Sequence, residues 1–356
     1  MTEMPLTIAP GFRFSDPNRF DIAAYERYVD EKLPAEDPRI FCLHPNAEIG
    51  YLTNLGETLF FTILACSGGS GGGGGAKKED IVGEMLTGFL ERLPEPFNMI
   101  ELNAKVKERS PYVVVCLQEC EKMNILTETM RKSLVDLDDG FAGRLNITDD
   151  METLANSMFL NKQPDLWVKY AYFSLKSLPA WFEDLLLRID QLTAYAEELV
   201  APKSLWISGL FNPMSYLTAI MQVTARRDGL PLDGMCLQTD VLNVEDPEQI
   251  PENAENGAYI HGFFLQGAAW EMGRGTDQGQ LCDMKPKELT PQLPVVHVTA
   301  IETKDKRSAG YYECPVYVTS ARGPTYVFTA GLRMESDEFD EKLWILAGVA
   351  LLMAPE

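Results

Sequence analysis

The chain has 356 residues, of which 46% are hydrophobic, and its 53 acidic and 31 basic side chains give a net charge of −22. This length and hydrophobic content suffice to bury the cores of two or three domains. Lysine and arginine provide the attraction to phosphates and anionic lipids, so the acidic balance argues against direct binding of nucleic acid or membranes.

The cysteines and the amino-terminal residues indicate the compartment. Seven cysteines, an odd number scattered over a long chain, do not form a disulfide framework, and we expect reduced thiols in a cytosolic compartment. The first residues lack a basic stretch followed by an apolar run, and no run of about 18 apolar residues occurs anywhere. We therefore expect neither secretion nor a membrane span, and we interpret the sequon at Asn146 as a chance match.

The first 80 residues contain few signs of regular structure. Residues 10–45 are rich in proline, aspartate and aromatic side chains, and they predict an extended, surface-packed segment with one helical stretch at residues 22–31. A short apolar run at residues 59–66 leads into the glycine-rich stretch 67–76, where five consecutive glycines, Gly71 to Gly75, predict a flexible loop.

Helices are expected to dominate from residue 78 to about residue 145. Between residues 116 and 139, apolar side chains recur at spacings of three and four, with a break at Thr127, and Glu119 lies off this stripe with Lys122, Arg131 and Lys132. The pattern predicts one long amphipathic helix that buries a single face, made of Cys116, Cys120, Met123, Met130, Leu134 and Leu137.

Three further helices and then four strands complete the predicted order. Helices are expected at residues 151–160, 178–200 and 217–227, each bounded by proline or glycine. After Pro231 the hydrophobic period changes to two, which predicts strands at residues 258–265, 295–302, 311–320 and 325–332, the last two joined as a hairpin by residues 321–324. The chain is therefore predicted to be α+β, with helical first two-thirds and a β-barrel-like or sandwich-like last third.

The glycine run does not satisfy the requirements of a phosphate-binding loop. Such a loop ends in Gly-Lys-Ser or Gly-Lys-Thr, so that an ammonium and a hydroxyl reach the nucleotide and its metal ion. Here Gly75 is followed by Ala76, Lys77, Lys78 and Glu79, without a hydroxyl. We interpret this stretch as a linker.

Other groups that carry chemistry are also incomplete. Cys116 and Cys120 lie four apart on one helix face, but structural zinc needs four ligands and no second pair is present. His44, His261 and His297 have no histidine or glutamate partner at metal-ligand spacing. Adjacent carboxylates are expected at the solvated surface: Asp138 and Asp139, Asp149 and Asp150, and Glu197 and Glu198. The sequence thus predicts no catalytic, cofactor-binding or metal-binding residue.

Several blocks of sequence, in order along nearly the whole chain, resemble one family. They are residues 37–52, 96–99, 110–126, 205–213, 216–222, 313–317, 322–327 and 344–352. These blocks resemble the carboxy-terminal end of dynein heavy chains. The residues at Asn212-Pro213 and at positions 344–348 are similar to those of the axonemal, outer-arm type. Residues 268–271, Ala-Ala-Trp-Glu, depart from the family's usual Ala-Arg-Trp-Asp.

The resemblance implies a domain order and a role. It implies the end of the sixth AAA+ module's large part at residues 1–80, its helical lid at 81–147, and the helical and β-rich parts of the C-terminal domain at 148–230 and 231–356. The parent would be an ATP-hydrolysing motor of the ciliary or flagellar axoneme that binds ATP and magnesium elsewhere. This segment would have no enzymatic activity or cofactor, and it would pack on the AAA+ ring and modulate the motor.

The resemblance also suggests partners and leaves alternatives open. The expected partner is the remaining ring of the same heavy chain, with intermediate and light chains as further candidates, and the acidic surface disfavours a direct microtubule contact. The alternative is that the β-rich part serves as a docking module for light chains or other axonemal regulators. An independent hydrolase or sugar-binding β-sandwich would need a convergent polar pocket. Six aromatic residues are candidates either for packing on the ring or for this chain's own core: Trp167, Tyr170, Tyr172, Phe173, Trp181 and Phe182.

Overall fold

The computed structural model of the chain describes most of its residues. These are Ile22, Glu26, His44 and residues 46–67, 78–273, 278–335 and 341–354. The helix predicted at residues 22–31 (apart from Ile22 and Glu26), the loop predicted at residues 68–76, and Cys42 lie outside the described residues. Ser67, predicted to begin that loop, instead ends a helix.

The protein forms two compact units, residues 1–64 with 285–289, and residues 65–284 with 290–356. The first unit contains most of helix α2, Asn46–Ser67. The Asn46 side chain, which is buried, donates to the carbonyls of Lys285 (3.0 Å) and Glu288 (2.8 Å) and accepts from the Lys287 amide (2.7 Å). Three hydrogen bonds from one amide thus hold the start of α2 to residues 285–289.

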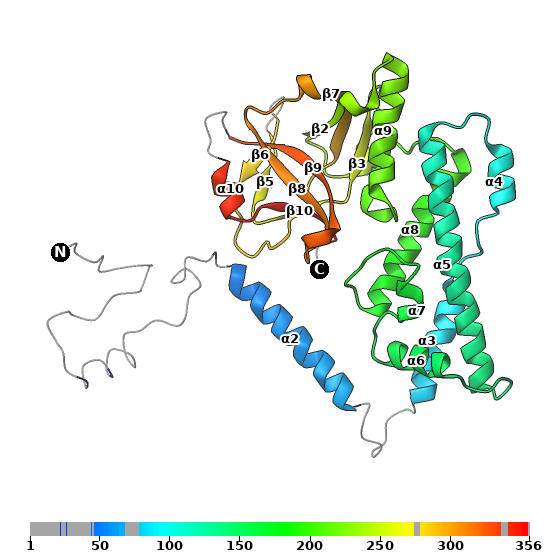
Figure 1. Ribbon diagram of the computed structural model, residues 1–356. Helices are drawn as coiled ribbons and strands as arrows, with labels where there is room; N and C mark the ends of the chain where they lie inside the picture. The colour runs from blue at the N-terminus through cyan, green and yellow to red at the C-terminus, as the bar shows by residue number, and fades with distance from the viewer. Residues whose placement is uncertain are drawn as a thin grey trace. The chain divides into compact units, whose positions relative to one another are not determined.

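The helical part of the second unit is arranged around one long helix. α5, Pro111–Phe141, contacts helices α3, α4, α6, α7, α8 and α9 (Figure 1). These helices span Lys78–Arg92, Met99–Lys105, Asp149–Phe159, Asp165–Val168, Leu178–Glu198 and Pro213–Asp228. In the described part of the protein, no helix has both the length and the apolar composition that a membrane crossing needs.

The predicted stripe of α5 is confirmed and is wider than expected. All six predicted stripe residues are buried. Thr127, predicted as a break, is buried too, because its hydroxyl donates to the carbonyls of Met123 (3.0 Å) and Asn124 (3.3 Å) one turn earlier. Ser110 caps the helix by accepting from the Val113 amide (3.3 Å), and Pro111 fits the first turn, where no amide is needed.

One four-stranded sheet contains a strand from the predicted helical region. Its order is β1-β3-β7-β2, with bounds Ser204–Trp206, Ala258–His261, Val296–Glu302 and Met235–Val241. β1 pairs in parallel with β3, and the other pairs are antiparallel. Helix α9, Pro213–Asp228, contacts β2 and β7. It begins four residues before the prediction because Pro213 is compatible with a first turn.

The last strands form a second sheet and a small ribbon. The order is β4-β10-β8-β9, with bounds Phe264–Gln266, Ala350–Ala354, Tyr311–Thr319 and Tyr326–Arg333. β5 (Ala269–Glu271) pairs with β6 (Gln280–Cys282), and a short helix, α10 (Lys342–Leu346), precedes β10. The α+β class and the β8–β9 hairpin are confirmed. The barrel-like or sandwich-like description is too specific, because the described strands form separate sheets and no closed barrel.

The strand predicted at residues 258–265 is wrong in one respect, since it is two strands in different sheets. β3 pairs with β1 and β7, whereas β4 pairs with β10. The backbone passes from one sheet to the other at Gly262, whose φ of +94° lies in the region that favours glycine. The buried positions change phase there, from Ala258 and Ile260 to Phe263 and Leu265, but apolar residues on both sides of the turn made the two strands look like one in the sequence.

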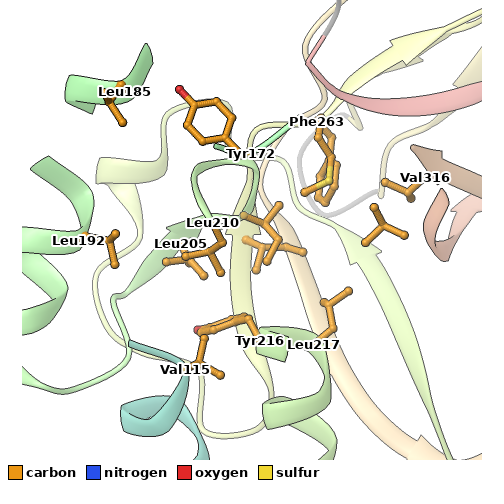
Figure 2. Close-up of a cluster of buried hydrophobic side chains, with 14 of the residues drawn as sticks. Val115, Tyr172, Leu185, Leu192, Leu205, Leu210, Tyr216, Leu217, Phe263 and Val316 are labelled. Carbon is orange, nitrogen blue, oxygen red and sulfur yellow. The ribbon is translucent and has the colours of Figure 1, made fainter. Parts of the chain in front are cut away.

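A continuous apolar core joins the helices to both sheets. Figure 2 shows side chains from α5 (Val115), α8 (Leu185, Leu192), β1 (Leu205), α9 (Tyr216, Leu217) and β8 (Val316) in one cluster. The hydroxyl of Thr239 also links the sheets, because it donates to the carbonyl of Gly331 (3.0 Å) and accepts from the Gly331 amide (2.8 Å). The four predicted domains stay predictions, although the helical and β-rich parts of the second unit share this core.

We predict that Gly262→Ala lowers the free energy of unfolding by at least about 3 kcal/mol. An added Cβ would be strained at this φ and would overlap the indole ring of Trp206. Gly229→Ala is the matched control, because its φ is +68° but no atom lies within 4 Å of the added Cβ. It should cost about 1–2 kcal/mol. Urea unfolding measures both, and equal losses would contradict the role of Trp206.

Candidate functional site

Residues 204–213, which we call the junction segment, connect α8 to α9 and contact helices and sheet alike. The segment contains β1, a short 3₁₀ turn at Ile207–Gly209, and the loop that leads into Pro213. Gln191 of α8 holds its start, since its amide donates to the Trp206 carbonyl (3.1 Å) and accepts from the Trp206 amide (2.8 Å). Ser208 donates to the Gly262 carbonyl (2.6 Å), next to the turn between the sheets.

The end of the junction segment is bound by a buried carboxylate of α5. The two Glu119 oxygens accept from the backbone amides of Phe211 (2.5 Å) and Asn212 (3.0 Å), and the residue is only 1% exposed. The sequence prediction that Glu119 lies off the buried face is therefore wrong. The reason is that Glu119 accepts two backbone amides of the loop before Pro213. The hydrophobic period of a helix contains no information about a contact with a loop more than 90 positions away.

The surroundings of Glu119 act on its ionisation in opposite directions. Burial raises the pKa of the Glu119 carboxyl, and this effect exceeds the lowering by the two amide hydrogen bonds and by the charges of Lys122 and Arg188. The net pKa is raised from its ordinary value of 4.5.

Three charged side chains cluster near the same segment. Asp184 of α8 accepts from Lys176 Nζ at one oxygen (2.8 Å) and from Arg188 Nε at the other (2.7 Å), and Asp184 and Arg188 are both buried. Burial alone would raise the pKa of Asp184, but the charge and hydrogen bond of Arg188, together with those of Lys176, outweigh it and lower that pKa. Opposite charges at i and i+4 are a sequence signal that the predictions overlooked.

The Arg188 guanidinium also stacks on aromatic rings. Its central carbon lies 3.5 Å from the centroid of the Tyr172 ring and 5.2 Å from that of Trp206. Such cation–π contacts hold the plane of the guanidinium as well as stabilising its charge. Beside it lies a pocket with a volume of about 100 Å³, smaller than the roughly 300–1,000 Å³ typical of small-molecule sites.

The structure separates the six aromatic candidates into two groups. Trp167, Tyr172, Trp181 and Phe182 are buried in this chain's own core, whereas Tyr170 and Phe173 are 38% and 52% exposed. Trp167 and Trp181 stack with ring centroids 6.1 Å apart, and Trp167 donates to Ser133 of α5 (2.9 Å). Only the two exposed rings therefore remain candidates for packing against another part of a larger protein.

The side chains considered for metal or nucleophilic chemistry have structural partners. Cys116 and Cys120 are free and buried, and His261, whose pKa burial lowers to about 4, contacts the Ser204 hydroxyl (2.9 Å). His297 contacts the Asn256 carbonyl (2.8 Å), and His44 accepts from the Asn46 amide (3.1 Å). Among the described residues, no group of three histidine, cysteine or acidic side chains could hold a metal ion.

The predicted carboxylate pairs also have simple roles. Asp138 and Asp139 both pair with Arg144, at 3.2 and 2.6 Å, where the backbone turns after α5. Asp149 and Asp150 lie in the first turn of α6, where negative charge favours the helix dipole, and Glu197 and Glu198 lie in the last two positions of α8. That the protein has no catalytic, cofactor-binding or metal-binding residue stays a prediction.

The order of these elements, together with the sequence, identifies the class of protein. Residues 53–353 match the C-terminal domain of the dynein heavy chain, and the protein belongs to that family. The family match includes α3 and α5 as well as the junction segment and both sheets.

The similar proteins are axonemal heavy chains. Over 99% of this chain, dynein axonemal heavy chain 17 of Homo sapiens is 45% identical and the ciliary dynein beta chain of Tripneustes gratilla is 47% identical. Over 98%, the flagellar outer arm dynein alpha chain of Chlamydomonas reinhardtii is 45% identical. The chain spans only 8% of the length of each. The predicted membership among axonemal, outer-arm type dyneins of cilia and flagella is confirmed.

We predict that Glu119→Gln destabilises the protein by about 1–3 kcal/mol at acidic pH, because the amide can accept from only one of the two backbone N–H groups. A raised pKa in the folded state stabilises the fold most below about pH 4.5, and that contribution is lost as pH rises through the folded pKa. The deficit of the variant should therefore shrink toward neutral pH.

Urea unfolding at a series of pH values measures this deficit. Glu121→Gln, on the exposed face of the same helix, is the matched control and should show little change. A loss of stability that is constant or grows as pH rises would contradict a raised pKa for Glu119 in the folded protein.

Proposed function

We propose that this protein is a non-catalytic C-terminal part of a microtubule-based motor, and that it packs on the AAA+ ring of the same heavy chain and modulates the motor. Family membership and the small fraction of the relatives' length that it spans support this proposal. Other parts of the parent would bind and hydrolyse ATP with magnesium.

The observation that carries the proposal is the surface of α2. Leu52, Leu55, Leu59 and Ile63 follow each other at spacings of three and four residues, and each is 51–59% exposed. Tyr51 and Phe60, which flank this stripe on either side, are 66% and 64% exposed. A helix with so wide an apolar face is stable when neighbours cover it. We infer that the covering residues belong to other parts of the same heavy chain.

The structure also offers a way in which packing can affect the motor. α5, expected to lie in the AAA+ lid, is bound through Glu119 to the junction segment of the C-terminal domain. A displacement of α5 would therefore be transmitted to the β-rich part through a buried contact. A bound element shifts a conformational equilibrium by its different contacts in the two states, so this protein can bias the ring without performing chemistry.

A docking role for the β-rich part is the second candidate. Short helix α10 exposes Leu343, Ile345 and Leu346, at 56%, 58% and 84%, while Trp344 between them is buried. This apolar surface favours a site for light chains or other axonemal proteins.

We predict that α2 substitutions weaken association with the rest of the motor. The 356-residue chain would be co-expressed with the preceding part of its heavy chain as a separate polypeptide. Leu55→Lys combined with Leu59→Lys should reduce co-purification at least about tenfold, because two buried leucines contribute about 1.5–3 kcal/mol each.

Leu343→Lys combined with Leu346→Lys is the control for this experiment, since it adds the same two positive charges at exposed positions of α10. It should leave the association intact. If the α2 variant co-purifies as well as the unaltered protein, or if only the α10 variant loses the partner, α2 is not the contact.

We also predict that the 356-residue protein shows neither saturable ATP binding nor ATP hydrolysis. The sequence lacks a Gly-Lys-Ser or Gly-Lys-Thr loop, and the described residues lack a metal-binding group. Calorimetric titration with ATP and magnesium measures binding, and titration with magnesium alone corrects for the metal. Stoichiometric binding at micromolar concentration would contradict a non-catalytic role.

A further inference from the structure

The pocket beside Arg188 has a composition that suits a specific ligand. Its apolar walls come from several elements, and its polar lining consists of one serine of the junction segment and a group of charged and polar side chains before and on α8. The apolar walls are Tyr172, Phe173, Leu210, Phe211, Pro213, Val318 and Met353, and the polar lining is Ser174, Lys176, Asp184, Arg188 and Ser208.

Arg188 has hydrogen-bonding capacity that the described residues do not exhaust. Its side chain is only 7% exposed, and Nε donates to Asp184. The two terminal nitrogens carry four further N–H groups. The Tyr172 hydroxyl interacts with this guanidinium but can accept from at most one or two of them, and its own proton goes to the Trp181 carbonyl (3.4 Å). The Tyr172 ring below the guanidinium fixes its plane, so that its outer edge is presented in one orientation.

The two nearby carboxylates, Asp184 and Glu119, do not bind the terminal nitrogens of Arg188. Both oxygens of Asp184 are bound, one by Lys176 and one by Arg188. Glu119 is close enough to Arg188 for an electrostatic interaction, but both of its oxygens accept backbone amides, and it does not line the pocket. Arg188 lines the pocket and its terminal nitrogens are bound by neither carboxylate, so a further acceptor in the pocket can pair with them.

We propose that this pocket binds a carboxylate on a short apolar stem. The carboxylate pairs end-on with the two terminal nitrogens of Arg188, and the stem contacts Phe211 and Met353. A planar guanidinium edge matches the spacing of two carboxylate oxygens, which makes this the strongest neutralising partner for it. The volume of about 100 Å³ suits a side-chain carboxylate and not a nucleotide.

Two sources can supply such a group. Ala354 lines the pocket, and Glu356 follows it by two residues in the sequence. Alternatively, an acidic side chain of another part of the motor enters in trans. The chemistry is the same in both cases, and the site is independent of the contact proposed for α2.

Titration of the full 356-residue protein with propionate tests the site, with chloride used to hold ionic strength constant. The readout is the saturable shift of the backbone amide resonances of Phe173, Ser208, Phe211 and Met353. If the source is in trans, the unaltered protein saturates with propionate. If Glu356 is the source, Glu356→Gln with an amidated terminal carboxyl binds propionate markedly more tightly than the unaltered protein, because both carboxylates of residue 356 are then removed.

Two variants remove the site in different ways. Arg188→Lys loses the bidentate edge and should weaken propionate binding at least about tenfold in whichever background saturates. Because this change also alters a buried ion pair, Val318→Phe provides a second variant, which fills the pocket from β8 and leaves the pair unaltered. Arg92→Lys is the matched control, since Arg92 makes an exposed bidentate pair with Glu183.

The proposal is wrong if neither the unaltered protein nor the amidated Glu356→Gln variant gives a saturable response at the four amides, which would mean that water satisfies Arg188. It is also wrong if Arg92→Lys weakens propionate binding as much as Arg188→Lys does. It is wrong, too, if phosphate shifts the same amide resonances and saturates at a lower concentration than propionate. The last result would assign the pocket to phosphate.

Discussion

The carboxylate of Glu119 is the contact on which the arrangement of the second unit depends. It lies in the first third of α5, the longest helix among the described residues, and accepts two successive backbone amides just before the first turn of α9. Those amides belong to the two residues directly before Pro213, so the carboxylate holds both the loop and the start of the helix in position. α9 in turn contacts β2 and β7. One ionisable group, together with the direct packing of α5 against α9, thus positions the helices on the first sheet.

A second layer of polar contacts surrounds this one. Gln191 binds both the amide and the carbonyl of Trp206, while Asp184 and Arg188 lie on the same helix. A buried ion pair is weak evidence for stability, because desolvation opposes the Coulomb attraction. Its better-supported effect here is specificity of orientation, since the guanidinium contacts Tyr172 and Trp206 from a fixed position. The junction segment is therefore held by directional contacts in addition to apolar packing.

The sequence predicted the long elements well and the short ones poorly. α5, α8 and the β8–β9 hairpin extend over enough residues for their hydrophobic period to be recognised. β1, β5 and β6 contain three residues each, too few to show a period. β10 is buried along most of its length, so it has an unbroken apolar run and no alternation. The burial of Glu119 depends on amides more than 90 positions away, and no local pattern contains that information.

The place of β10 has a consequence for how the protein is made. β10 lies inside its sheet, between β4 with an antiparallel register and β8 with a parallel one. Both strands that pair with it are synthesised earlier, so the edges of β4 and β8 that bind β10 have no partner until β10 has been made. Closure of this sheet is necessarily a late event of biogenesis. A premature stop before residue 350 would remove an internal strand of the second sheet.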